Sequence, residues 1–281
     1  QAPSTIYAGT ASGVFKSTNC GATVSFSWVG SRWVYALAID PLTHSTVYAG
    51  TRGEGVYKSL DSGATWFKAN TGIEDQVVYS LAINPLNPNT LYIGSRSITS
   101  GKSAALDEWD PAAYPAMQSP DMDDSEEGTT EWGGGVFRSL DGGLHWTRQN
   151  NGLIEDWAYS VAIDPANTAI IYAGLHTQGV FKSWDYGNTW IKTGPGLNNS
   201  KVRSIAIDPI NSWNVLVATW HGGIFQSTDG GNNWGNNTLP TTKVRYLAFG
   251  RYEVYAGLWG GGVYKSINRG GSFSVVNNGL V

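Results

Sequence analysis

An eight-residue box occurs six times along this chain, with a serine, an Asp or Asn, a glycine and usually a tryptophan at fixed offsets. The intervals between successive box Asp or Asn residues are 42, 80, 44, 44 and 39 residues, so one repeat unit carries a long insertion. Self-similarity at this period is typical of architectures built by stacking one small unit. The copies are STNCGATV (17–24), SLDSGATW (59–66), SLDGGLHW (139–146), SWDYGNTW (183–190), STDGGNNW (227–234) and SINRGGSF (266–273).

Three short apolar runs precede the box in a typical unit. The first ends in Asp-Pro or Asn-Pro, as in VYSLAINP (78–85), and the second contains Tyr-Ala-Gly, as in TVYAGT (46–51). The third, as in GVYKS (55–59), leads into the box. These runs are short, rich in Val, Ile and Tyr, and bounded by Gly or Pro, which is typical of β-strands. The chain is therefore predicted to be all-β, with four antiparallel strands per unit, named A to D in chain order.

A lone sheet of this kind is apolar on both faces and cannot cover itself. Radial stacking of such sheets buries both faces and leaves only short edges. We therefore predict a single β-propeller domain over 1–281, with six blades of four antiparallel strands, or seven if the chain is incomplete. The first unit has no strand A before STIYAG (4–9), so we expect the ring to be closed weakly within the chain, by a continuation of the polypeptide past Val281, or by a strand from a neighbouring molecule that pairs with the open edge.

The box itself is predicted to be a structural staple between strands C and D. Its Asp can accept hydrogen bonds from backbone N–H groups of its own turn. Its glycine permits a positive φ, and its tryptophan can pack between sheets while the indole N–H finds a partner. The residues assigned this role are Asp61, Trp66, Asp141, Trp146, Asp185, Trp190, Asp229 and Trp234.

The motif S-x-D-x-G-x-[TN]-W on a β-hairpin resembles the Asp-box repeat, also called the BNR or bacterial neuraminidase repeat. This repeat occurs in sialidases, sortilin-type receptors, photosystem II assembly propellers and two-propeller xyloglucanases. The longer strings VYSLAINPLNPNTLYIGS (78–95) and GGVFRSLDGGLHW (134–146) are most similar to the xyloglucanase and sortilin-like propellers. The resemblance implies the propeller fold over nearly the whole chain. It does not choose a function, because this fold serves enzymes, receptors and assembly factors.

Composition limits the classes of partner. Charged residues make up 14% of the chain and the net charge is −4, with no basic stripe, so nucleic acid is not expected to bind. No apolar run is long enough to span a membrane. Signal cleavage would explain the start QAPSTIYAG, and a chain poor in Lys and Glu suits a secreted protein, so we expect an extracellular or cell-surface location. No cofactor is required by this interpretation.

Function is expected in loops, on the face built by the D–A and B–C connections and opposite the boxes. This face gathers aromatic, Arg and His residues, and such groups suit a sugar because Trp covers its ring while polar groups bond its hydroxyls. Trp220 and Trp259 are followed by glycines and are expected to be uncovered. We interpret the face as a glycan- or protein-binding surface, and the open strand edge as a second way to bind a protein. The candidates are Arg52, Arg96, His176, Trp220, His221 and Trp259.

The alternative is a glycoside hydrolase or polysaccharide lyase related to the xyloglucanases, which needs two carboxyl groups at a defined separation. The candidates are Glu54, Asp75 and Asp156. By the resemblance, a catalytic Asp should stand in a loop reading YARTDxGGAYRW, but the matching YAGTRGEGVYKS (48–59) has Arg52 there. The sequence therefore favours a binding protein over an enzyme. A structural subunit of an extracellular assembly is the third interpretation.

A long acidic insertion at 97–132 replaces one short B–C loop. Between 105 and 131 it contains nine acidic residues and no basic one. Oxygen ligands at this density could hold Ca²⁺, although Glu126 stands where an EF-hand loop has glycine. A solvated acidic loop without metal is the other interpretation. The calcium ligands would be Asp121, Asp123, Asp124 and Glu126.

Overall fold

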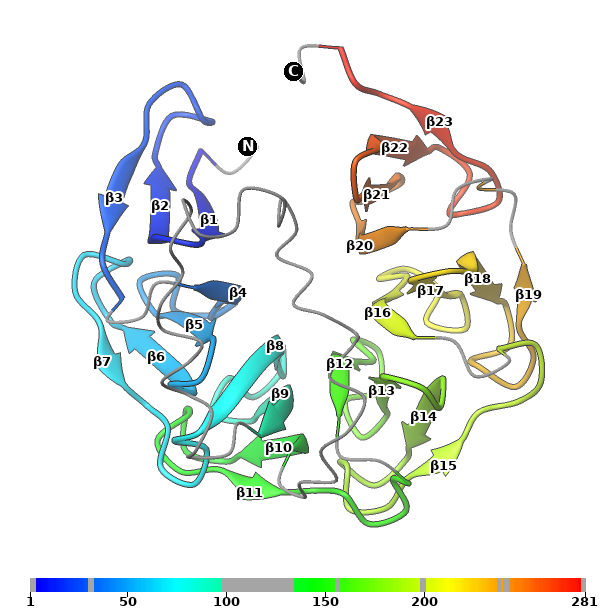
Figure 1. The fold of residues 1–281 in the computed structure, drawn as a ribbon, viewed down its shortest axis with the longest axis horizontal. Coiled ribbons are helices and arrows are strands. Elements are labelled where there is room, and N and C mark those ends of the chain that lie inside the picture. The colour runs from blue at the N-terminus through cyan, green and yellow to red at the C-terminus, as the bar shows by residue number, and fades with distance from the viewer. Residues whose placement is uncertain are drawn as a thin grey trace, which may run out of the picture.

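The computed structural model describes residues 4–29, 33–97, 134–154, 157–197, 201–236, 239 and 243–278. Their strands form six antiparallel sheets arranged as the blades of a propeller (Figure 1). No helix occurs in these ranges, and thus none that is long and apolar enough to cross a membrane. The prediction of an all-β propeller with six blades is confirmed.

Five blades have four strands in the order A to D, and the first has three, which correspond to strands B to D. Strand A is the innermost strand of each complete blade (Figure 1). The blades are numbered 1 to 6 along the chain. Blade 1 consists of β1 (Ile6–Thr10), β2 (Gly13–Ser17) and β3 (Ser25–Ser27); blade 2 of β4 (Val34–Ile39), β5 (Val47–Thr51), β6 (Val56–Ser59) and β7 (Phe67–Lys68); and blade 3 of β8 (Gln76–Ile83), β9 (Leu91–Ser97), β10 (Gly135–Ser139) and β11 (Thr147–Arg148). Blade 4 consists of β12 (Ala158–Ile163), β13 (Ile171–Leu175), β14 (Val180–Ser183) and β15 (Ile191–Lys192); blade 5 of β16 (Val202–Ile207), β17 (Val215–Thr219), β18 (Gly223–Ser227) and β19 (Gly235–Asn236); and blade 6 of β20 (Val244–Phe249), β21 (Val254–Leu258), β22 (Gly262–Ser266) and β23 (Ser274–Val275).

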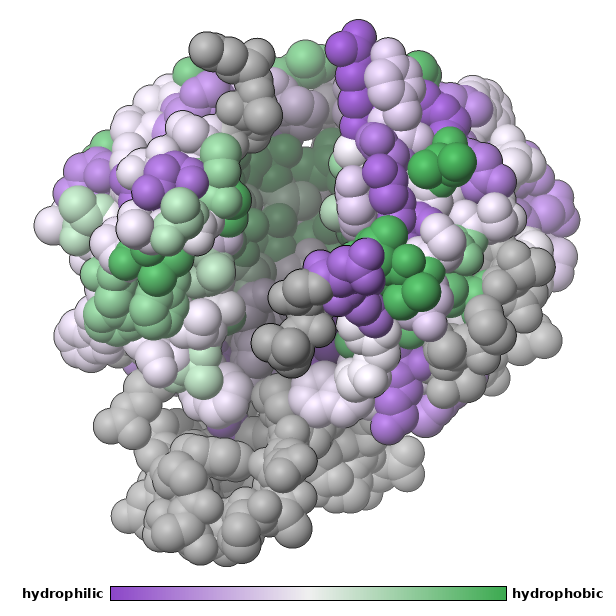
Figure 2. Space-filling model, turned by 90° about the horizontal axis from the view of Figure 1, so that it is seen from above, coloured by the Kyte–Doolittle hydropathy of each residue, from purple (hydrophilic) through white to green (hydrophobic). Residues whose placement is uncertain are grey.

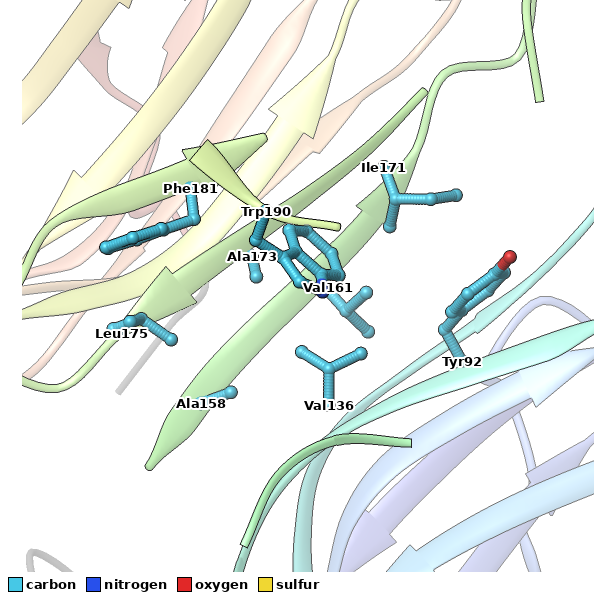
Figure 3. Close-up of a cluster of buried hydrophobic side chains, with 9 residues drawn as sticks. All are labelled: Tyr92, Val136, Ala158, Val161, Ile171, Ala173, Leu175, Phe181 and Trp190. Carbon is cyan, nitrogen blue, oxygen red and sulfur yellow. The ribbon is translucent and has the colours of Figure 1, made fainter. Parts of the chain in front are cut away.

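The hydrophobic core lies in the joints between neighbouring blades. Figure 3 shows the joint of blades 3 and 4, where Tyr92 and Val136 of blade 3 pack with Val161, Ile171 and Trp190 of blade 4. Burying each large apolar side chain contributes about 1.5–3 kcal/mol. The stability of the ring therefore depends on contacts between adjacent blades, as in other repeat proteins.

A glycine in strand B lets the next blade approach closely. A Cβ built on Gly174 would lie 2.3 Å from Val202 Cγ1, and one on Gly50 would lie 2.6 Å from Val78 Cγ1. Val202 is the first residue of strand A in the following blade, and Val78 stands at the same repeat position, as the third residue of the longer β8. The Tyr-Ala-Gly run thus ends in glycine because strand A of the next blade lies directly on it.

In blades 1, 2 and 4, a tyrosine and a lysine bind the blade to the box of the next one. Tyr48 Oη and Lys58 Nζ both donate to the carbonyl oxygen of Gly142, at 3.1 and 2.8 Å. Tyr172 and Lys182 donate to Gly230 O in the same way, at 2.9 and 2.7 Å. We call this pair of donors the Tyr–Lys clamp. It explains why Tyr and Lys recur in strands B and C.

The box forms the expected staple. In blade 2, Asp61 Oδ1 accepts the N–H of Thr65 at 2.8 Å, and Ser59 Oγ accepts the N–H of Gly63 at 2.7 Å. Trp66 Nε1 donates to Ser27 Oγ of the preceding blade at 2.9 Å. The residue before the box glycine also has a positive φ in all six boxes. The sequence does not reveal this, because the residue type at that position differs from box to box.

The box carboxylates should make the fold sensitive to acid. The Thr65 side-chain hydroxyl, followed by the Thr65 N–H and the Ser59 hydroxyl, holds the pKa of Asp61 well below its usual range. A depressed pKa in the folded state adds stability above the unfolded pKa of about 4, and that stability is lost as the pH falls toward the folded value. Asp61→Asn should therefore have a somewhat lower Tm than wild type at pH 7 and a smaller fall in Tm by pH 3.

The chain supplies a precedent for this substitution. Asn19 and Asn268 occupy the same box position and accept the N–H groups of Thr23 and Ser272 through Oδ1, both at 2.9 Å. Their amides donate to the hydroxyls of those residues, and the Thr65 hydroxyl can turn in the same way. Asp61→Ala, which lacks the acceptor, should lower the Tm at both pH values. An Asn variant as acid-sensitive as wild type would contradict the prediction.

Candidate ligand-binding face

Repeated backbone hydrogen bonds place four of the predicted residues on one face. Each donates its N–H to the residue just before strand A of its own blade, over 2.9–3.1 Å. The box turns instead bond the A–B connections, for example through the N–H of Ser62 to Ser45 O. The boxes therefore lie opposite this face, as predicted. The four pairs are Arg52 with Trp33, His176 with Trp157, Trp220 with Lys201, and Trp259 with Lys243.

A β-bulge near the start of strand A in every complete blade, at its second residue or at the fourth residue of the longer β8, turns a side chain toward the centre of the ring. The pairing register skips this residue in all five complete blades. Bulges re-aim side chains in this manner. The ring centroids of Tyr35 and Tyr79 lie 5.7 Å apart, those of Tyr79 and Tyr159 lie 4.9 Å apart, and the Arg203 guanidinium lies 4.1 Å from the Tyr159 centroid. We call the five residues the bulge ring: Tyr35, Tyr79, Tyr159, Arg203 and Arg245.

Four arginines surround the tyrosines of this ring. Burial raises the pKa of Tyr35 to about 12, against the opposing charges of Arg52 and Arg245. Burial likewise raises the pKa of Tyr79, with Arg96 and Arg203 opposing. The tyrosines therefore stay protonated at neutral pH and can donate hydrogen bonds, while arginine stays charged. We call the arginine cluster the set Arg52, Arg96, Arg203 and Arg245.

Cations cover the tryptophans of this face. Arg203 and Lys243 lie 4.8 and 5.5 Å from the Trp220 ring, and Arg245 lies 5.3 Å from the Trp259 ring. Each such contact is worth about 0.5–1 kcal/mol when exposed and more when desolvated. Trp220 is only 5% exposed, so the expectation that its following glycines leave it uncovered does not hold. Trp259 is partly exposed.

His176 belongs to a stack beside the ring. Its imidazole lies parallel to Trp157, with centroids 4.1 Å apart and an interplanar angle of 13°. Arg96 lies 4.5 Å from the same tryptophan ring. His176 is buried, whereas His221 is exposed at the rim and packs edge-on against Trp220. His176 thus positions the aromatic support of Arg96, and His221 is open to a ligand.

The predicted carboxylates do not gather with the arginines. Glu54 accepts a hydrogen bond from Tyr57 Oη at 2.6 Å and forms an ion pair with Lys68 Nζ at 3.1 Å. Both partners belong to the outer strands of blade 2. Asp75 is exposed in a D–A loop, and Asp156 lies outside the described residues. Within the described part of the chain, no three His, Cys, Asp or Glu residues could hold a metal ion together. The predicted calcium ligands, Asp121, Asp123, Asp124 and Glu126, also lie outside the described residues.

The sequence analysis missed much of the bulge ring. Tyr35, Tyr79, Tyr159 and Arg245 were read only as strand residues. A signal was present, because the second residue of strand A is always Tyr or Arg in VYA, VYS, AYS, VRS and VRY. The alternation of apolar and polar residues along strand A does not reveal the bulge, because a bulge is a shift of register between strand A and its partner strand B.

Comparison with known proteins supports the fold. No family model matches the sequence, and no curated protein is detectably similar to it in sequence. Among solved structures, an ancestral GH74 enzyme has 20% identity and a TM-score of 0.66, covering 94% of this chain and 35% of that one. The GH74 xyloglucanase from Xanthomonas campestris has 14% identity and a TM-score of 0.60, with coverages of 96% and 39%. YCF48 bound to a D1 peptide has 14% identity and a TM-score of 0.57, with coverages of 86% and 67%.

This chain therefore spans little more than a third of the two GH74 enzymes. At such low identity the likeness concerns the backbone alone. The chain thus has the same β-propeller fold as these GH74 enzymes and YCF48.

Proposed function

We propose that this protein is a secreted or cell-surface propeller of the Asp-box type, and that its D–A and B–C face binds a ligand carrying carboxylates. The carboxylates would belong to a glycan or to an acidic segment of a protein. The arginine cluster around the bulge ring carries this proposal, because it concentrates positive charge at the centre of a chain whose net charge is −4. No cofactor is needed for binding of this kind.

The state of the aromatic rings favours an acidic ligand over a neutral sugar. A neutral sugar needs an open aromatic face, but cations lie over Trp157, Trp220 and Trp259. A guanidinium stacked on an aromatic ring can still bind a carboxylate through two parallel hydrogen bonds in its own plane. The protonated Tyr35 and Tyr79 hydroxyls add neutral donors nearby.

A glycoside hydrolase is the second candidate, because two of the similar structures are GH74 enzymes. It would use Asp75 and Asp156, since Glu54 is held by Tyr57 and Lys68. This alternative makes a separate prediction, which is the release of reducing ends from a polysaccharide.

The test measures binding of the purified full chain to polygalacturonate, poly-glutamate and neutral xyloglucan, with and without calcium. Arg203→Gln and Arg245→Gln should each weaken binding about tenfold, the usual loss for one charge-assisted hydrogen bond. Arg251→Gln is the matched control, because it removes the same charge from the exposed A–B connection of blade 6. Binding should also weaken as NaCl rises, since the contacts are ionic.

The outcomes separate the candidates. Binding to either acidic polymer, lost in the two cluster variants and kept in Arg251→Gln, supports the proposal and identifies the polymer class. Equal binding to xyloglucan, or cluster variants that bind like wild type, would refute the acidic ligand. Reducing-end release that disappears in Asp75→Asn would make the protein a hydrolase. Circular dichroism of Arg203→Gln controls for its packing on Tyr159.

A further inference from the structure

The joint of blades 3 and 4 contains a cavity on the face of the boxes. Figure 2 shows the wide hollow between blades 1 and 6, with apolar residues along its wall. The joint of blades 3 and 4 differs from that hollow, because strands pack against each other there from both sides. Its cavity has a volume of about 310 Å³, in the range of sites for small organic molecules. We call it the joint cavity, and its lining includes Asn84, Leu86, Tyr92, Arg138, Leu140 and Tyr186.

An arginine takes the place of the clamp lysine in this joint. Tyr92 Oη and Arg138 Nη1 both donate to the carbonyl oxygen of Tyr186 at 2.8 Å, as the Tyr–Lys clamp does elsewhere. The guanidinium has five N–H donors, more than this contact uses. Among the described residues, no acceptor meets the buried Arg138 Nε, and no carboxylate forms an ion pair with Arg138. The joint cavity therefore has a positive charge with unused donors in its wall.

The neighbouring joints have a carboxylate where this one has an amide. The residue that ends strand A and precedes proline is Asp40 in blade 2, Asp164 in blade 4 and Asn84 in blade 3. All three are buried, and the Oδ1 of each accepts the N–H groups of the residues two and three positions later, at 2.8–3.2 Å. Burial lowers the pKa of the clamp lysines in blades 2 and 4, and the Asp of the same blade opposes this effect. Asn84 thus keeps the backbone contacts of these aspartates without their charge.

Other groups of the described chain do not replace this charge. In the joint of blades 5 and 6, Arg269 Nη1 binds both carboxylate oxygens of the buried Asp208, which is the pairing that Arg138 lacks. The box carboxylates do not account for the difference, because one stands in every box that a clamp contacts. The acidic insertion joins β9 to β10 beyond Ser97, at the end of blade 3 opposite the boxes. Among the described residues, the joint cavity therefore lacks the negative charge that its counterparts have.

The Asn84 amide adds a second unused donor. Because its Oδ1 accepts two backbone N–H groups, the orientation of the amide is fixed. Nδ2 then meets no acceptor among the described residues, although Asn84 is only 5% exposed. A buried donor without a partner is costly, and a ligand that accepts from it removes that cost. Arg138 and Asn84 both line the joint cavity, so both donors are available to an acceptor bound there.

We infer that the joint cavity binds a small organic acid, whose carboxylate supplies the charge that an aspartate supplies in the other joints. Arg138 would bind this carboxylate through two parallel hydrogen bonds, and Asn84 Nδ2 would donate a third. The rim of the cavity is apolar, because Leu86, Leu140 and Tyr186 are 73%, 63% and 48% exposed. The acid therefore carries an apolar body beside its carboxylate. The inference does not depend on the ligand of the opposite face.

The test measures binding of 3-phenylpropionate to the purified full chain by isothermal titration calorimetry. Binding should be saturable, with a Kd of about 1 mM or tighter for a ligand of this size. The neutral 3-phenylpropionamide should bind about tenfold more weakly, the usual loss for a charge-assisted hydrogen bond. Asn84→Asp should weaken binding of the acid about tenfold or more, because the new carboxylate pairs with Arg138 and repels the ligand. Arg138→Lys should also weaken it about tenfold, since lysine keeps the clamp but lacks the paired donors.

Each variant introduces the residue that blade 2 has at the same position, so both should keep the wild-type Tm or raise it. Asn211→Asp is the matched control, because it adds the same charge to the exposed A–B connection of blade 5, and it should bind the acid normally. A wild-type chain that does not bind the acid, equal binding of the amide, or variants that bind like wild type would each overturn the inference. Binding that Arg203→Gln removes would place the acid on the opposite face and would also overturn it.

Discussion

Replacing Gly174 by alanine is expected to destabilise the protein strongly, although alanine normally suits a strand better than glycine. The new Cβ would lie 2.3 Å from Val202 Cγ1 and 3.3 Å from Ile205 Cδ1. Both side chains are buried in the joint of blades 4 and 5, so neither can move without disturbing its neighbours. Overpacking of this kind costs about 1–3 kcal/mol and can cost more. Urea unfolding followed by tryptophan fluorescence measures the loss.

Gly257→Ala is the matched control, because the two glycines end the same Tyr-Ala-Gly run. Nothing lies within 4 Å of the added Cβ in blade 6. The substitution should leave the free energy of unfolding unchanged or raise it by up to about 1 kcal/mol, since alanine loses less backbone entropy on folding. Equal losses in the two variants would show that contact with the next blade is not what requires glycine.

The fold was predictable because its signals are local. The box, the Tyr-Ala-Gly run and the Asp-Pro ending each report a turn or strand within a few residues, and repetition makes them unambiguous. The strands of blade 1 were predictable for the same reason, since STIYAG and GVFKS match strands B and C of the other units. The positive φ at Ser62 and Tyr186 was not, because only the turn, and not the residue type, imposes it.

The site was harder to predict because its decisive contacts link different blades. Trp220 looked uncovered next to its glycines, yet Lys243, from the connection that leads into blade 6, lies over its ring. Arg203 reaches Tyr159 in blade 4 only because a bulge turns it toward the centre. Neither contact is encoded near the residue concerned. The sequence predicted the side of the ring on which Arg52, His176 and Trp220 lie, but it gave the wrong environment for Trp220.

Trp190→Ala should have the largest effect of any box substitution. Trp190 is only 3% exposed, packs with Tyr92 and Val136 of blade 3, and donates Nε1 to Gln149 O at 2.8 Å. Truncating a buried aromatic residue costs about 3–5 kcal/mol, and the Gln149 carbonyl would also lose its donor. Trp66→Ala, at the same box position in blade 2, should cost less because Trp66 is partly exposed beside the incomplete blade 1.

The open ring adds a second expectation for these variants. In a closed ring, two blades that lose their joint stay connected around the other side. Here no strand joins blade 6 to blade 1 among the described residues. Among the described residues, the joint of blades 3 and 4 supplies the packed strand contacts between blades 1–3 and blades 4–6, so weakening it should uncouple these two halves, whereas Trp66→Ala loosens blade 1 alone. Because repeat proteins are stabilised by nearest-neighbour interfaces, Trp190→Ala should unfold in two steps, with fluorescence and far-UV circular dichroism transitions that do not coincide. A single coincident transition with an unchanged m-value would show that the blades remain coupled by another route.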